Sequence, residues 1–259
     1  MTRAALGGTI PAMHDLPEPA DVLAFGPHPD DVEICAGGLL LRQAQAGKRC
    51  VIVDFTRGEA GTRGTPEQRA EEAAAAARVL GLAGRENLGL PDAGLRVVPE
   101  QEEAVVAAIR RWRPRLVLSP CREDRHPDHL AAAEMVRRAY YAATIARAPG
   151  GGLPPHRPDA LVEYFGHLEP TPSFIVDVTD VWELRMDAVR CYGSQLGEGP
   201  RGGTVTNIAS PDFARRLEAR YAYWGSRIGA AYGEPFRVDR MVPIDDPLDA
   251  FRKRGWAVL

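Results

Sequence analysis

The sequence predicts an α/β protein built around a doubly wound, mostly parallel β-sheet. Short apolar runs alternate with longer helical patterns through the first half of the chain, which is typical of repeated strand–helix–strand units and a Rossmann-like sheet. No linker, repeat or low-complexity segment divides the 259 residues, so we expect residues 21–259 to form one domain. Residues 1–20, which contain several glycines and prolines, are expected to form a flexible tail.

The expected strands are short apolar runs, as is typical of strands buried on both faces of a parallel sheet. The first, Asp21–Gly26, opens the domain, and the second, Cys50–Phe55, follows one helical pattern later. The run Asn87–Leu90 is the weakest, and the second half of the chain is less regular than the first. In chain order, we expect strands over residues 21–26, 50–55, 87–90, 116–119, 160–165 and 174–178.

Capping and breaking residues mark several of the expected helices. Gly47 ends the first helical pattern, and Gly81 ends the second. Thr65 and Pro66 suit the N-cap and the first position of that second helix, and Gln68 can complete a capping box. In chain order, we expect helices over residues 33–46, 66–80, 99–112, 127–146, 181–192 and 211–231.

Charge, hydropathy and cysteine spacing exclude several classes of function. The net charge of -3 provides no basic excess, which argues against a nucleic-acid partner. No run of about 18 apolar residues occurs, so no membrane span is expected. The four cysteines, Cys35, Cys50, Cys121 and Cys191, form no Cys-x-x-Cys pair, which indicates reduced thiols and a cytoplasmic protein. Exposed helices in the second half could form the contacts of a homo-oligomer.

Two short segments concentrate the residues that can perform chemistry. Pro27–Glu33, with the sequence PHPDDVE, follows the first strand, and Arg125–His129, with the sequence RHPDH, follows the fourth. In the common doubly wound order the fourth strand lies beside the first, and ligands bind in the crevice at their carboxyl ends. One such segment alone is equally typical of a solvated turn. Two of them facing one crevice predict an active site.

The residues of these segments suit a catalytic metal site. We expect His28, Asp31 and His129 to bind zinc, because three imidazole or carboxylate ligands leave one position open for water. Fe²⁺, Co²⁺ or Mn²⁺ would suit the same ligands. Asp30 is expected to act as the general base toward the attacking water. His126, if protonated, would stabilise an oxyanion or protonate a leaving amine.

Four further residues are expected to assist at this site. Asp128 is expected to orient or charge His126, because the two lie close together in the sequence. Arg69 is the favoured contact for a hydroxyl or carboxylate group of the substrate, ahead of Arg63 and Arg57. Taken singly, each arginine is also typical of a surface or helix-capping charge.

Other classes of protein use related residues. Two histidines and one carboxylate also bind iron in non-haem oxygenases, but those triads usually stand on a double-sheet barrel and not on alternating strands and helices. A nucleotide-binding α/β protein would carry G-x-G-x-x-G in the first strand–helix turn, where this chain has Pro-His-Pro-Asp-Asp. A purely binding, inactive relative would have lost some ligands, and all of them are present here.

The two segments together resemble the defining motifs of the LmbE-like, or PIG-L, family of zinc de-N-acetylases. The matching residues are PHPDDVE at 27–33 and HPDH at 126–129. The stretches DFTRGEAGTRGTPEQRAEEA, RENLGLPD, EDRHPDH and YGSQ are similar to the deacetylase branch of bacillithiol biosynthesis. The resemblance extends from about Val22 to Phe236, which is nearly the whole chain.

This resemblance implies a reaction and a substrate. It implies hydrolysis of N-acetylglucosaminyl-malate, a small amino-sugar molecule, to glucosaminyl-malate and acetate. It implies that His28, Asp31 and His129 bind zinc, that Asp30 is the base and that His126 assists the oxyanion or the leaving group. It also places Arg69 near the substrate. Relatives act on inositol glycosides, chitin oligomers or thiol conjugates, so other N-acetylglucosamine conjugates are the alternative substrates.

The chain departs from the family pattern at one point. Some relatives place a tyrosine in the active site, either from a loop near the C-terminal helix or just before HPDH. The corresponding residues here are Phe213 and Asp124. The oxyanion would then be stabilised by zinc and His126, with Tyr192 as a further candidate.

Overall fold

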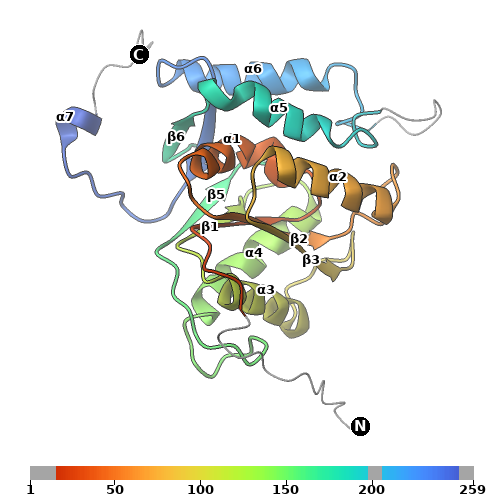
Figure 1. Ribbon diagram of the computed structural model, residues 1–259, viewed down its shortest axis with the longest axis vertical. Coiled ribbons are helices and arrows are strands. Elements are labelled where there is room, and N and C mark those ends of the chain that lie inside the picture. Colours follow the sequence, from red (N-terminus) through yellow and green to blue (C-terminus); the bar gives the residue numbers. More distant parts are fainter. Residues whose placement is uncertain (1–15, 198–205, 251–259) are drawn as a thin grey trace.

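The computed structural model describes residues 16–197 and 206–250 of the chain. Its centre is a seven-stranded sheet with the order β3-β2-β1-β4-β5-β7-β6 (Figure 1). The strands are β1 (Val22–Gly26), β2 (Cys50–Thr56), β3 (Gly84–Leu90), β4 (Leu116–Pro120), β5 (Ala160–Tyr164), β6 (Phe174–Asp177) and β7 (Gly233–Arg237). The α-helices are α1 (Asp31–Gln45), α2 (Pro66–Val79), α3 (Pro99–Trp112), α4 (Pro127–Ala142), α5 (Trp182–Arg190), α6 (Phe213–Ser226) and α7 (Pro247–Ala250).

The first five strands form the parallel part of the sheet. β1 pairs with β2 on one side and with β4 on the other, so that Val22 is in register with both Cys50 and Leu116. β7 pairs antiparallel with β5 and with β6 at the far edge. This arrangement confirms the predicted mostly parallel, doubly wound fold, with the fourth strand beside the first.

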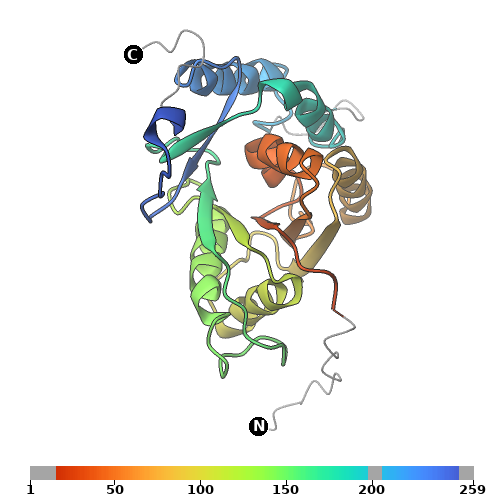
Figure 2. The same cartoon turned by 60° about the vertical axis from the view of Figure 1, so that its left-hand side comes forward.

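Helices cover both faces of the sheet (Figure 1). α3 and α4 pack over Leu23 and Phe25 on one face, whereas α1, α2 and α5 pack over Ala24 and Ile52 on the other. Successive side chains of a strand point to opposite faces, so each buried strand contributes to both cores. Full burial of a side chain such as Phe25 stabilises the fold by roughly 1.5–3 kcal/mol. α6 packs against β6 and β7 (Figure 2).

β7 is a strand that the sequence pattern did not predict. Its residues, Gly233–Arg237, show no apolar alternation, and its second residue, Glu234, is a fully buried charge. The Glu234 carboxylate accepts hydrogen bonds from the main-chain N–H groups of Gly38 and Leu39, both at 2.7 Å, and lies 3.6 Å from Arg185 Nε. Glu234, the buried polar residue that interrupts the apolar pattern of β7, therefore also joins β7 to the middle of α1.

The ends of the predicted elements differ slightly from the structure. The helix expected over residues 127–146 ends at Ala142, and the one expected over 211–231 spans Phe213–Ser226. Of the predicted tail, residues 1–15 lie outside the described residues, whereas Ala20 is buried and its N–H donates to Trp112 O at 2.8 Å. The fold thus begins before residue 21, and a single domain to residue 259 stays a prediction.

A membrane-crossing helix was not expected from the sequence. Among the described residues, every helix is too short or too polar to cross a membrane.

Candidate active site

The two His/Asp segments meet at the point where the strand order reverses. One joins β1 to α1, and the other leads from β4 into α4, and β1 and β4 are neighbours in the sheet. The ring centroid of His28 lies 5.1 Å from that of His126 and 5.6 Å from that of His129. The geometry thus brings together side chains that are far apart in the sequence, at the crevice where doubly wound folds bind ligands.

His28, Asp31 and His129 converge on one point. Asp31 Oδ2 lies 3.2 Å from His28 Nδ1 and 3.3 Å from His129 Nε2. One ligand atom from each of the three residues falls within 4.8 Å of the others. Ligands bound to one zinc ion at 2.0–2.2 Å in a tetrahedron lie about 3.4 Å apart, so these spacings fit three ligands of a single cation.

Each of these two histidines has a carboxylate against its other ring nitrogen. His28 Nε2 lies 3.1 Å from Asp92 Oδ1 and 3.4 Å from Asp128 Oδ2. His129 Nδ1 lies 3.2 Å from Asp124 Oδ2. Carboxylates in this position fix the orientation of a metal-binding ring and increase its basicity, which is a second reason why the residues fit a metal.

The electrostatics of the cluster favour a cation. Burial alone would lower the pKa of His28, but hydrogen bonds to Asp128, Asp31 and Asp92 raise it well above its usual value. Burial also opposes the charge on His129, yet Asp31 and Asp124 raise its pKa to about 9. The cluster therefore attracts positive charge, and a divalent cation would supply it while the rings stay neutral ligands.

Asp30 lies beside His28, Asp31 and His129 without joining this group. Its φ of 122° is rare for a residue with a side chain and costs of order 1–3 kcal/mol. Arg69 Nη2 lies 3.2 Å from Asp30 Oδ2 and also donates to the carbonyl of Pro29. Burial raises the pKa of Asp30 to about 7, against the opposing charge of Arg69. Arg69 is thus placed to hold the Asp30 side chain. The sequence did not predict this contact.

His126 is the N-cap of α4, and this role determines its tautomer. Its Nδ1 accepts a hydrogen bond from the N–H of Asp128 at 3.2 Å, so in the neutral ring the proton lies on Nε2. Burial, together with the neighbouring His129 and His28, lowers the pKa of His126. The neutral ring of His126 therefore already offers an Nε2–H donor, so the oxyanion role predicted for His126 does not depend on a protonated ring.

The Asp128 carboxylate has other partners than the predicted one. It accepts hydrogen bonds from the N–H groups of Ala93 at 2.8 Å and Leu95 at 3.3 Å, and it faces His28. Only the main-chain N–H of Asp128 contacts His126 among the described hydrogen bonds. The reason is that the first turn of α4 directs this side chain toward the loop after β3. Asp128 thus contacts and orients His28, whereas its side chain acts on His126 through charge alone, which works against burial to raise the pKa of that ring.

Two hollows of about 370 Å³ each meet at the cluster. The loop-side hollow is bordered by residues 60–62, Asp30, Arg69 and His126. The helix-side hollow is bordered by α6. Asp31, His129, His167, Asn207 and Ile208 border both. A molecule bound at this cluster can therefore extend in two directions.

Among the described residues, Arg69 borders the loop-side hollow, whereas Arg57 and Arg63 lie outside the two hollows. Arg57 is exposed and borders a separate cavity behind Pro29. The carbonyl of Arg63 accepts a hydrogen bond from Gln195 Nε2 at 2.8 Å, so this arginine helps to fix the loop beside the hollow.

The tyrosine candidate of the sequence does not reach the cleft. Tyr192 is buried and its hydroxyl donates to Glu33 Oε1 at 2.8 Å, and Glu33 is in turn paired with Arg85. Tyr192 thus supports the first turns of α1 from behind. Phe213 borders the helix-side hollow.

Sequence reasoning missed Asp92 and His167 and gave no structural role to Asp124. Asp92 contacts His28, and Asp124 contacts both His129 and His167. His167 follows β5, which is the neighbour of β4. The rule used for the two motifs, that polar residues after neighbouring parallel strands meet, would have found His167 as well.

Comparison with known proteins identifies the family. Fold and site define an α/β enzyme with a candidate metal centre at the switch point of its sheet. The family model PIG-L: GlcNAc-PI de-N-acetylase matches residues 23–140. Diacetylchitobiose deacetylase of Thermococcus kodakarensis is 30% identical over 233 residues, which cover 83% of this chain and 82% of that protein. The chain belongs to the PIG-L, or LmbE-like, family of deacetylases.

Solved structures agree with this assignment. A conserved protein of Thermus thermophilus is 40% identical, with a TM-score of 0.78 over 87% of this chain and 98% of its own. N,N'-diacetylchitobiose deacetylase of Pyrococcus horikoshii is 25% identical, with a TM-score of 0.73 over 90% and 89%. The relatives confirm the expected enzyme class, an N-deacetylase. A hydratase of Pseudomonas putida shares the fold at 22% identity and a TM-score of 0.69, so the fold alone does not define the reaction.

Proposed function

We propose that this protein hydrolyses the acetamide of an N-acetylglucosamine-containing small molecule, with a divalent cation held by His28, Asp31 and His129. One observation carries the proposal: the three ligand atoms meet with the spacing of a tetrahedral site, beside the buried carboxylate of Asp30. Family membership supports the deacetylase reaction, and the donor set supports zinc.

The residues of the chain divide the chemical work. When bound, a cation such as zinc polarises the acetamide carbonyl and acidifies water. Asp30, held by Arg69, accepts the proton of the attacking water. His126 Nε2–H donates a hydrogen bond to the oxyanion that develops on the carbonyl oxygen. The C–N bond then breaks and the proton from Asp30 passes to the amine, which leaves acetate and a free amino sugar.

We propose N-acetylglucosaminyl-malate as the substrate, in the bacillithiol branch of the family. The stretches RENLGLPD and YGSQ support this choice. Two arginines that border the helix-side hollow, Arg125 and Arg216, would suit the carboxylates of malate. Chitooligosaccharides, inositol glycosides and thiol conjugates of N-acetylglucosamine are the alternatives. Four unpaired cysteines support a reducing, cytoplasmic location.

An acetate-release assay on the zinc-loaded protein tests the proposal. The substrates are N-acetylglucosaminyl-malate, N-acetylglucosamine, diacetylchitobiose and an N-acetylglucosaminyl-inositol. We expect release from the malate conjugate with the highest kcat/KM, and Asp30→Asn provides the inactive control with the metal retained. No acetate from any of the four would refute the deacetylase, and a preference for another conjugate would refute the malate assignment. Oxygen uptake with iron and a keto acid would instead identify the oxygenase.

A further inference from the structure

His167 lies in the middle of the cleft, and neither motif includes it. It follows β5, the neighbour of β4 in the sheet, so its segment lies beside the RHPDH segment. The residue borders both hollows, and 28% of its side chain is exposed. Resting on the proposed deacetylase function, we propose that His167 binds the sugar of the substrate, with its ring accepting a hydrogen bond from a sugar hydroxyl.

Asp124 fixes the orientation of His167. Its Oδ1 accepts from His167 Nδ1 at 2.9 Å, and its Oδ2 accepts from the main-chain N–H of His167 at 3.0 Å. The same carboxylate lies 3.2 Å from His129 Nδ1. Because Nδ1 of His167 donates to a carboxylate, the lone pair of the neutral ring is on Nε2. One buried aspartate thus orients a metal ligand and presents a free acceptor to the cleft.

The segment that carries His167 approaches Asp124 too closely for any residue but glycine. A Cβ atom at Gly166 would lie 2.4 Å from Asp124 Oδ2 and 3.2 Å from His129 Nδ1. Arg220 of α6 holds this segment by donating to the carbonyls of Gly166 at 2.8 Å and Phe165 at 3.0 Å. The position of His167 is therefore imposed from two sides.

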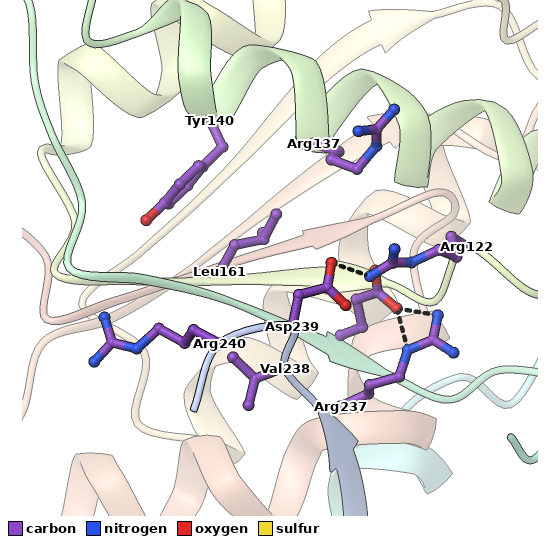
Figure 3. Close-up of a pocket in the computed structure, with 9 residues that line it drawn as sticks. Arg122, Arg137, Tyr140, Leu161, Arg237, Val238, Asp239 and Arg240 are labelled. Carbon is purple, nitrogen blue, oxygen red and sulfur yellow. Dashed lines mark hydrogen bonds and ion pairs between the residues drawn. The ribbon is translucent and has the colours of Figure 1, made fainter. Parts of the chain in front are cut away.

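The loop that carries Asp124 is held from its other side as well. Two residues earlier, Arg122 pairs with Asp239 at 2.5 Å (Figure 3). Arg122 also pairs with Glu163 at 2.8 Å, and Glu163 is paired in turn with Arg237. These pairs line a cavity of about 260 Å³ beside α4. Arg122 and Arg237 are already neutralised by these carboxylates. The ion pairs therefore support the Asp124 loop, and we assign no second ligand to this cavity.

Two variants separate a sugar contact from support of the metal. His167→Ala is expected to raise KM for the sugar substrate about two- to tenfold, the loss of one neutral hydrogen bond, with zinc affinity unchanged. Asp124→Asn is expected to lower zinc affinity about 10–100-fold, because it alters the partner of His129. Leu168→Ala changes an exposed neighbour that borders neither described hollow, and it provides the matched control.

Deoxy sugars then identify the hydroxyl that is bound. An analogue without that hydroxyl is expected to lose two- to tenfold in kcat/KM with the wild-type enzyme and nothing further with His167→Ala. An unchanged KM in His167→Ala would overturn the inference, and so would a loss of zinc affinity as large as that of Asp124→Asn. Zinc titration needs no turnover, and an inactive wild type would refute the proposed function separately from this role of His167.

Discussion

Replacing Gly166 by alanine tests how tightly the metal ligand depends on its supporting carboxylate. The added Cβ would lie 2.4 Å from Asp124 Oδ2, so the two groups must separate by at least 0.6 Å to reach the 3.0 Å below which such contacts are essentially never found. That shift weakens the bond between Asp124 and His129. We expect zinc affinity to fall about 10–100-fold, which removes about 1.4–2.7 kcal/mol of metal-linked stability.

The measurement is thermal unfolding with and without zinc, combined with a chelator competition. Crowding alone is expected to cost the metal-free protein about 1–3 kcal/mol. The rise in Tm on adding zinc is expected to shrink by roughly 3–11 °C, at about 2–4 °C per kcal/mol. Gly37→Ala, in the middle of α1, is the control, because its nearest neighbour would be a side-chain carbon at 3.2 Å. Wild-type zinc affinity in Gly166→Ala would refute the reasoning.

Three further variants test other parts of the site, and a thiol probe tests the core. His129→Ala is expected to lose bound zinc in elemental analysis, whereas Asp30→Asn is expected to keep it and lose roughly 10²–10⁴-fold in turnover. Arg69→Ala is expected to lower kcat more than it raises KM, because the Arg69 side chain holds Asp30. A change in KM alone would instead support the earlier expectation that Arg69 contacts the substrate. Burial raises the pKa of the Cys50 thiol to about 12, so a disulfide reagent at about pH 9 is expected to label Cys191 alone until the protein unfolds. Fast labelling of Cys50 in the folded protein would contradict this picture.

Apolar periodicity was sufficient to predict most of the sheet. β1 and β2 are buried throughout and mostly apolar, and they were predicted nearly to the residue. β7 was missed because Glu234 occupies a buried strand position, where a pattern of apolar residues gives no signal. Its partners, the N–H groups of Gly38 and Leu39, lie almost two hundred residues away, and no local rule connects them.

The sequence was sufficient to predict the part of the candidate site that the two His/Asp segments supply. His28 and His129 follow strands and belong to clustered polar segments, so topology alone brought them together. The partner of the Asp128 carboxylate could not be predicted, because it depends on the direction in which the first turn of α4 points its side chains. The strand-end rule applies to His167 too, but this residue was missed because a single histidine after a strand has the same local pattern as any polar loop residue.

The buried Glu234 also bears on when the proposed metal site can form during synthesis. Asp31 is the first residue of α1, and the middle of that helix is joined to β7, which is among the last segments of the described chain to be synthesised. A growing chain contains both histidine motifs long before this strand exists. We therefore expect ribosome-bound intermediates to bind zinc weakly. Tight zinc binding would follow completion of the sheet, so unfinished chains would not deplete the metal supply of the cell.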